Sequence, residues 1–286
     1  MTIALDSSLL DAPKVQGLSA RACCSAPDRS SRGHVVAGPR GNQLLAALPA
    51  CDWEHLSQHM ELVDMPLGQV LYESGSDLNH VYFPNTAIVS LLNLTASGAC
   101  AEFAAVGNDG VVGVPLLMGG MSTNGRAVVQ SAGHGHRLHR QVINDELHAG
   151  GAVMQLLMRY TQALLTQVAQ NALCNRHHSV EQQVSRLILQ NLDRVQGNCL
   201  QMTQEVLASK LGVRRESVTL VALALQREGL IRYARGRIEV LDRQGLEAKA
   251  CECYAVVKLE CDRLLPPAAP DVSDLWAMRC TVSRFG

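Results

Sequence analysis

The chain has 286 residues, of which 47% are hydrophobic and 18% charged, and its formal net charge is −1. This length suffices for about two domains, and the composition excludes a chain that is disordered throughout. The near-neutral charge means that any nucleic-acid signal has to be local. No stretch is apolar enough to span a bilayer, and residues 1–10 lack the pattern of a secretory signal. We therefore expect no membrane partner, and a cytoplasmic protein whose ten cysteines are mostly reduced.

The first half of the chain passes from an irregular leader to a series of short strands. Residues 1–40 are rich in Pro, Gly, Ser and Arg and predict a flexible leader. A helix broken at Pro49 is expected over 42–60. Short apolar runs separated by Gly, Asn and Asp turns then follow, including one at 111–117. They predict an antiparallel barrel, sandwich or jelly roll over 41–150.

A long helix is predicted over 151–178. Its apolar residues recur at three- and four-residue steps and are Val153, Leu157, Tyr160, Leu164 and Val168. Such a stripe packs either on the protein's own barrel or on a second copy of the chain, and both interpretations stay open at this point.

The segment 179–245 predicts a winged helix-turn-helix. Ser179 is a suitable N-cap for one helix, and Thr203 is a suitable N-cap for a second helix of about eight residues. Gly212 lies where the chain has to turn sharply into a third helix over 214–228, and Gly229 ends that helix. Residues 230–240 predict a hairpin that turns at Arg235-Gly236, and 246–286 predict a C-terminal helix and tail. The predicted fold class is therefore α+β.

The charge of this segment differs from that of the whole chain. The segment from Thr203 to Arg243 contains eight cationic and five anionic side chains, which gives it a net charge of +3. The cations are Lys210, Arg214, Arg215, Arg227, Arg232, Arg235, Arg237 and Arg243. Arginines and hydroxyl side chains at a helix N-terminus can reach base edges in a major groove, and a basic hairpin can lie along phosphates. An ordinary solvated helical hairpin is the weaker interpretation because shape, turn glycine and arginine-rich hairpin occur together.

The segment from Met202 to Thr219, MTQEVLASKLGVRRESVT, followed by LQREGLI at 225–231, resembles the helix-turn-helix of the Crp/Fnr regulators. The resemblance covers about residues 42–245 and includes a β-roll of the cyclic-nucleotide-binding type and a dimerisation helix. It implies a homodimer formed through about residues 153–168 that reads a palindrome in double-stranded DNA. It also implies RNA polymerase as a partner.

The resemblance also carries individual residues over. Arg215 and Glu216 match the family's base-reading pair, whereas Arg214 stands where many members have Ser and Leu220 where some have a further Arg. The operator sequence therefore stays open. The predicted DNA-contacting residues are Thr203, Arg214, Arg215, Glu216, Ser217, Thr219, Arg235 and Arg237.

The family's nucleotide site corresponds to two segments of this chain. The candidate effector-binding residues are Gly113, Val114, Arg126 and Ala127, with Arg126 as the phosphate partner. Val114 replaces the Glu that holds the ribose hydroxyl, a loss of about 1–3 kcal/mol or more. We therefore expect an effector other than cyclic AMP, or none, and no required cofactor. A solvated strand residue is the alternative for Arg126.

Cysteine and histidine sets give further candidates. Cys23, Cys24, Cys51 and Cys100 do not reproduce the ligand spacing of the Fnr-like iron–sulfur proteins. Two other sets could ligate a metal: Cys251-x-Cys253 with Cys261, and Cys174 with His177 and His178. Buried thiols without a metal are the commoner outcome, so no metal site is predicted.

The alternative from another class is a cupin-like metal-dependent oxygenase that uses His134, His136 and His139. No Glu lies three or four residues after His136, where that motif would place one, so we predict no catalytic residues. A nucleotide sensor without transcriptional output is a third hypothesis, and the helix that carries Arg215 and Glu216 argues against it.

Overall fold

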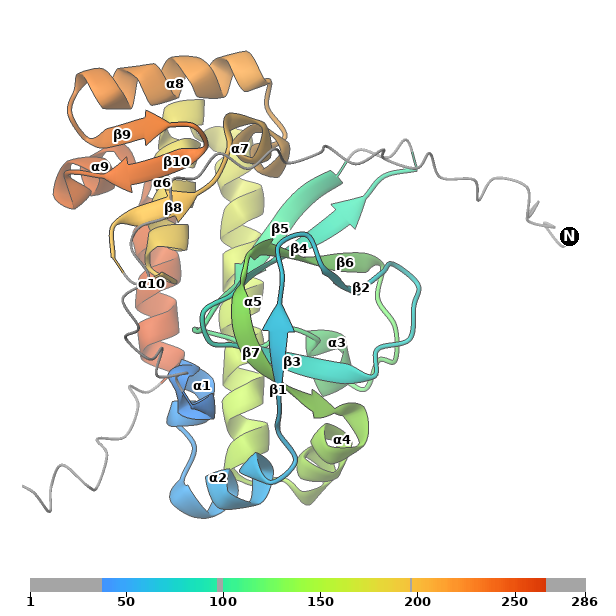
Figure 1. Cartoon of the computed structure of the whole chain (residues 1–286). Coiled ribbons are helices and arrows are strands. Elements are labelled where there is room, and N and C mark those ends of the chain that lie inside the picture. Colours follow the sequence, from blue (N-terminus) through green and yellow to red (C-terminus); the bar gives the residue numbers. More distant parts are fainter. Residues whose placement is uncertain (1–37, 97–99, 196, 266–286) are drawn as a thin grey trace, which may run out of the picture. The chain divides into compact units, whose positions relative to one another are not determined.

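The computed structural model describes residues 38–96, 100–195 and 197–265 (Figure 1). The leader predicted over 1–40 lies almost wholly outside the described residues, as do Cys23, Cys24 and the tail beyond residue 265.

Two antiparallel sheets form the predicted β-roll. One sheet has the order β1-β7-β3 and the other the order β2-β6-β4-β5. The strands are β1 (Glu61–Met65), β2 (Val70–Tyr72), β3 (His80–Pro84), β4 (Ile88–Leu94), β5 (Cys100–Val106), β6 (Gly125–Ser131) and β7 (Gly133–His139). Inward-facing apolar residues of both sheets, Val81, Phe83, Val89 and Ala127 among them, share one buried core. The antiparallel roll predicted from the sequence is confirmed.

Short helices lead into the roll. α1 (Gln43–Ala46) and α2 (Ala50–Ser57) are separated at Pro49, as the sequence predicts. The side chain of Asn42 accepts from the backbone N–H groups of Leu44 and Leu45, which caps α1. Its amide nitrogen also donates to the carbonyl oxygens of Pro84 and Gly110, each at 2.9 Å. A fully buried Asn42 therefore fixes α1 to the roll.

The strand predicted over 111–117 is wrong. Only Val112 pairs with a strand, through a bridge to Tyr82, and the next residues form α3 (Val114–Leu117). Gly113 takes a φ of 107°, which turns the chain away from the sheet. Pro115 has no N–H for a ladder hydrogen bond but fits the first turn of a helix. After β7 the chain forms a further helix, α4 (Arg140–Ala149).

The long predicted helix is α5 (Ala152–His177). Four residues of its apolar stripe, Val153, Leu157, Tyr160 and Leu164, are buried in the core of the roll, and Val168 packs against that core. The stripe therefore packs on the protein's own barrel. A different face of α5 is exposed and apolar, and it carries Met158, Leu165, Ala169 and Ala172. α10 (Glu252–Leu264) packs along α5, as Figure 1 shows.

A second core holds the helix-turn-helix segment. Its elements are α6 (Val180–Leu192), β8 (Cys199–Gln201), α7 (Gln204–Leu211), α8 (Arg215–Arg227), β9 (Ile231–Ala234), β10 (Arg237–Val240) and α9 (Arg243–Lys249). β10 lies between β8 and β9 in an antiparallel sheet. Ser179 begins α6 as the expected N-cap, in a reciprocal capping box with Gln182. Within the described ranges, no helix is both long and apolar enough for a membrane span.

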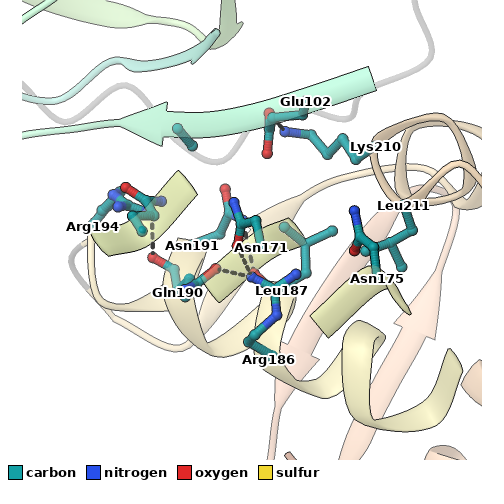
Figure 2. Close-up of a pocket in the computed structure, with 12 residues that line it drawn as sticks. Glu102, Asn171, Asn175, Arg186, Leu187, Gln190, Asn191, Arg194, Lys210 and Leu211 are labelled. Carbon is teal, nitrogen blue, oxygen red and sulfur yellow. Dashed lines mark hydrogen bonds and ion pairs between the residues drawn. The ribbon is translucent and has the colours of Figure 1, made fainter. Parts of the chain in front are cut away.

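A buried polar network joins the roll to α7. The ammonium group of Lys210 on α7 forms an ion pair with Glu102 on β5, and both side chains are almost fully buried (Figure 2). Lys210 Nζ also donates to Ser90 Oγ at 3.0 Å and to Gln130 Oε1 at 2.7 Å. Burial lowers the pKa of Lys210, and the charge of Glu102 opposes that effect. Nearby, Arg194 follows α6 and pairs with Asp109 at 2.9 Å.

The Lys210–Glu102 pair yields a stability prediction. Glu102→Gln is expected to lower the free energy of unfolding by about 3–5 kcal/mol, because it leaves the buried ammonium without a counter-ion. The double variant Glu102→Leu/Lys210→Met is expected to recover most of that loss, since it removes both charges. Urea unfolding followed by circular dichroism measures all three proteins. Equal stability of Glu102→Gln and the wild type would contradict a buried ion pair here.

Candidate nucleic-acid interface

The turn between α7 and α8 is set by local chemistry. Thr203 caps α7, its hydroxyl accepting the backbone N–H of Val206 at 3.2 Å. Gly212 takes a φ of 64° just after α7, the left-handed conformation expected from the sequence. Two residues later Arg214 is the N-cap of α8. The chain is thereby redirected within three residues, and α8 begins at the exposed Arg215.

The N-terminal end of α8 presents the predicted base-reading residues. Arg214, Arg215 and Glu216 are all exposed there. Arg215 Nε lies 4.0 Å from a carboxylate oxygen of Glu205, but both side chains are exposed, so this contact holds the guanidinium weakly. The free N–H groups of the first turn also point out of this end of α8. The surface can therefore offer a guanidinium fork, a carboxylate and backbone donors together.

Two residues predicted to contact DNA through their hydroxyl groups, Thr219 and Ser217, differ in their surroundings. Thr219 Oγ1 lies 2.7 Å from Gln204 Oε1 and 3.0 Å from the carbonyl oxygen of Arg215. Its single hydroxyl hydrogen is used inside the protein, where it ties α8 to α7. Ser217 is half-buried, and its backbone N–H donates to the carbonyl oxygen of Arg214. The partnership of Gln204 with Thr219 was not predicted, because spacing along two separate helices does not specify their contact.

The hairpin of β9 and β10 forms the predicted wing. Its two-residue turn has φ values of 49° at Arg235 and 76° at Gly236, which is a type I′ pattern that matches the twist of the strands. Arg235 and Arg237 are exposed. Tyr233 anchors the wing: its hydroxyl donates to the carbonyl oxygen of Met202 at 2.8 Å, and burial raises its pKa to about 12. This hydrogen bond ties the wing to the residue just before the N-cap of α7.

Some of the eight cations counted between Thr203 and Arg243 are paired with acidic residues or buried in the structure. Lys210 is buried against Glu102, Arg232 pairs with Glu239 at 2.8 Å, and Arg243 pairs with Asp193 and Glu247. Of these three cations, Lys210 is buried and Arg243 is half-buried, whereas Arg232 stays exposed. The exposed cations at the α8 N-terminus and on the wing are Arg214, Arg215, Arg232, Arg235 and Arg237. The exposed leucines Leu220 and Leu223 continue the outward surface of α8.

A model of the Crp-like helix-turn-helix domain matches residues 182–249. The chain carries a Crp-like helix-turn-helix domain on a Crp/Fnr fold. No match was found among the curated proteins.

Three solved structures illustrate this fold. FixK2 from Bradyrhizobium japonicum is 17% identical with a TM-score of 0.60, and the match covers 67% of this chain and 98% of that one. TTHB099, a CRP-family transcriptional regulator from Thermus thermophilus, is 21% identical with a TM-score of 0.55 and coverages of 66% and 96%. CLP, a c-di-GMP responsive global regulator from Xanthomonas campestris, is 15% identical with a TM-score of 0.54 and coverages of 67% and 99%. At these identities the matches describe the fold.

The β-roll has a cavity of about 530 Å³ against α5. Its lining is mostly apolar and includes Leu91, Phe103, Val114, Met118, Leu164 and Val168. Tyr72 also lines it, and burial raises the pKa of that phenol to about 12. A cavity of this size and character suits a small apolar molecule.

Of the four predicted effector-binding residues, only Val114 lines this cavity. Arg126 Nε lies 3.1 Å from a carboxylate oxygen of Glu73, in an ion pair that is partly exposed and therefore weak. Ala127 is buried in β6, and Gly113 supplies the turn before α3.

The three histidines of the oxygenase hypothesis are not gathered at one point. His134 Nδ1 contacts Thr86 Oγ1 at 3.1 Å, and His136 Nδ1 contacts Asn85 Oδ1 at 3.2 Å. His139 follows on the opposite face of β7, where it caps α4 and contacts the His80 ring. The one group with metal-ligand spacing in the described part of the chain is Cys174, His178, Cys251 and Cys253.

Proposed function

We propose that this protein is a homodimeric transcription regulator that reads a palindromic DNA sequence and responds to an effector in its β-roll. The observation that carries the proposal is the exposed Arg214-Arg215-Glu216 end of α8, placed beside an arginine-bearing wing. The family resemblance adds RNA polymerase as a partner and the cytoplasm as the location.

In this proposal each group has a separate task. Arg215 grips guanine O6 and N7 with its planar fork, and Glu216 accepts from cytosine N4. Thr203 and Ser217 lie near the helix N-termini and contact phosphates, together with Arg235 and Arg237 on the wing. Leu220 supplies an apolar side chain on the same outward surface, which suits a thymine methyl group.

The dimer is proposed to form through the exposed apolar face of α5. Met158, Leu165, Ala169 and Ala172 repeat at steps of seven, four and three, which is the spacing of a helix–helix seam. The small alanines permit close approach toward the C-terminal end of the helix. A two-fold dimer would carry two α8 helices to half-sites about 34 Å apart.

The cavity beside α5 is the proposed effector site. Its lining favours a small apolar ligand over a cyclic nucleotide, because it is mostly apolar, Arg126 is not part of it, and Val114 offers no hydroxyl acceptor. Leu165 lines the cavity and also belongs to the exposed face of α5. A ligand that prefers one position of α5 would shift the dimer geometry through that preference alone.

The proposed sequence-specific DNA binding is tested by selecting bound duplexes from a random pool at a stated salt concentration. We expect the wild type to enrich a palindrome. Arg215→Ala is expected to lose about 1–3 kcal/mol of binding free energy and to relax preference at one base pair of each half-site. Arg235→Ala is the control, since loss of a phosphate contact weakens all sequences alike. A wild-type protein that enriches no sequence would overturn the proposal.

The dimer face is tested with a charge placed on α5. Met158→Glu is expected to shift the protein from dimer to monomer in sedimentation velocity experiments, since it would bury a carboxylate at an apolar seam. Met121→Glu is the matched control, because Met121 is an exposed methionine that does not belong to α5. A dimer that survives Met158→Glu unchanged would move the interface elsewhere.

The effector cavity is tested with the neutral apolar dye Nile red. We expect its fluorescence to rise with the wild type and not with Val168→Trp, because the indole would fill the cavity. Val63→Trp on β1 is the control outside the cavity. Calorimetric titration with cyclic AMP is expected to give no saturable heat. Saturable binding of cyclic AMP that Arg126→Ala abolishes would replace the apolar ligand with a nucleotide.

A further inference from the structure

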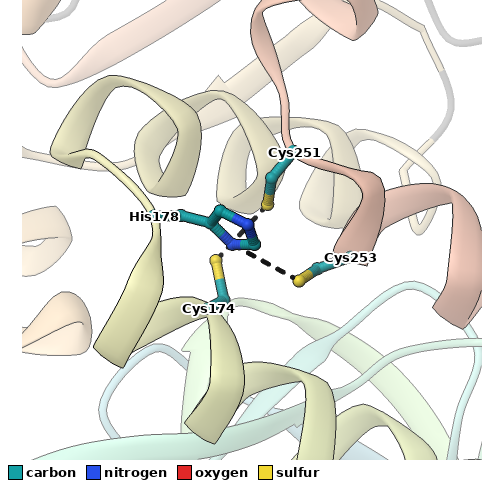
Figure 3. Close-up of side chains that lie close together, drawn as sticks. All are labelled: Cys174, His178, Cys251 and Cys253. Carbon is teal, nitrogen blue, oxygen red and sulfur yellow. Dashed lines mark hydrogen bonds between the residues drawn. The ribbon is translucent and has the colours of Figure 1, made fainter.

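Three cysteines and a histidine from distant parts of the chain meet beside the end of α5. Cys174 lies in the last turn of α5, and His178 follows the helix directly. Cys251 is the N-cap of α10, and Cys253 lies in its first turn. The Sγ atoms of Cys174 and Cys251 are 3.4 Å apart, and His178 Nδ1 is 3.5 Å from Cys253 Sγ. Figure 3 shows the four side chains converging on one point.

We propose that these four residues bind one zinc ion as a closed, tetrahedral Cys₃His site. The four ligand atoms lie within 4.8 Å of one another, one from each side chain. Around zinc, bonds of about 2.3 Å to sulfur and about 2.0 Å to nitrogen bring neighbouring ligands to about 3.3–3.8 Å. The two separations of 3.4 and 3.5 Å already have this size. An iron–sulfur cluster would need a wider spread, because several irons and sulfides separate its ligands.

A carboxylate orients the histidine for this role. His178 Nε2 lies 3.2 Å from an oxygen of Glu252, while Nδ1 faces the thiols. A histidine that ligates a metal commonly donates its other N–H to a carboxylate, which fixes the tautomer and the ring. With the proton on Nε2, the lone pair of Nδ1 points at the metal position. A group of inert buried thiols would not require this arrangement of the imidazole.

Positive groups lie beside the thiols, while burial raises the pKa of Cys174 and Cys253. Zinc binding would release one proton from each cysteine to solvent, so that three thiolates and Zn²⁺ carry a net charge of −1 with a neutral imidazole. The first turn of α10 offers free backbone N–H groups and the positive end of the helix dipole to Cys251 and Cys253. The buried guanidinium of Arg186 lies beside Cys174 and contributes a positive charge. All three cysteines are buried and free, and His178 is half-buried.

The place of the site in the fold indicates what the ion would hold. Cys174 and His178 bracket the end of α5, and Ser179 begins α6 of the helix-turn-helix domain. Cys251 and Cys253 come from the segment after the wing and α9. One ion would therefore fasten the α5–α6 corner to α10. An effect of this corner on operator binding rests on the proposed function, whereas metal binding does not.

The experiment measures metal on the full-length protein without DNA. Protein reconstituted with zinc and dialysed is expected to hold one zinc per chain by elemental analysis. Replacement by Co²⁺ is expected to give the intense ligand-field bands of a tetrahedral thiolate site. Cys174→Ser and Cys253→Ser are expected to lose the ion and these bands, whereas the control Cys199→Ser, which removes a free cysteine outside the cluster, retains both.

A second variant keeps the test valid if the cysteine variants fail to fold. Glu252 has a side chain that is 69% exposed, and Glu252→Gln removes only the carboxylate partner of His178. It is expected to weaken zinc binding about 10–100-fold in competition with a chromogenic chelator. The proposal is overturned by protein that takes up no zinc and gives no Co²⁺ bands, by an iron–sulfur absorption spectrum, or by a Cys174–Cys251 disulfide as the stable state. Because DNA is absent throughout, failure of operator binding would leave this result unaffected.

Discussion

The contact between α5 and the β-roll is the one on which the rest of the structure depends. Buried residues from Val153 to Leu164 join the helix to the core of the roll, and this burial fixes the rotation of the helix about its axis. Fixing the rotation decides which side chains lie on the remaining faces. It exposes Met158 and Leu165, places Thr161 and Val168 along the cavity, and brings Cys174 toward α10. One packing surface therefore sets the proposed dimer face, effector site and metal site together.

The connection between the roll and the helix-turn-helix domain has a different character, because it is polar. Lys210 and Glu102 are buried as a pair, and Arg194 reaches Asp109 across the same seam. Such pairs contribute little net stability compared with apolar residues of the same size, but each is costly to break singly. A seam of this kind favours one docked arrangement over slightly shifted ones. An effector that moves α5 relative to the helix-turn-helix domain would have to break these contacts. In the proposed response, the contacts would therefore set the least binding free energy that an effector must supply.

The proposed zinc site adds a third connection, at the corner where α5 passes into α6. Its ligands come from residues 174–178 and 251–253, so the segment closed between them contains the whole helix-turn-helix and wing. A bond network across a segment of that length restricts the unfolded chain as well as the folded one. The Crp-like domain would then be held at both ends of its sequence, by the corner before α6 and by α10 after the wing.

The sequence by itself determined the local structures. Thr203, Gly212, Gly229 and the Arg235-Gly236 turn act on their immediate neighbours, through capping and left-handed backbone, so their positions predicted the helix-turn-helix and its wing. The same local signals fix where α8 begins, and this start places Arg215 and Glu216 at its exposed N-terminal end. Only the tertiary structure decided which of the cations are at the surface, since Lys210 and Arg243 are neutralised by residues far away in the chain. It also decided that the α5 stripe packs on the roll, that 111–117 leaves the sheet at Gly113, and that members of both cysteine sets form one cluster. The physical reason is common to all of these: they depend on contacts between distant segments, and the periodicity and spacing of one segment do not specify its partner.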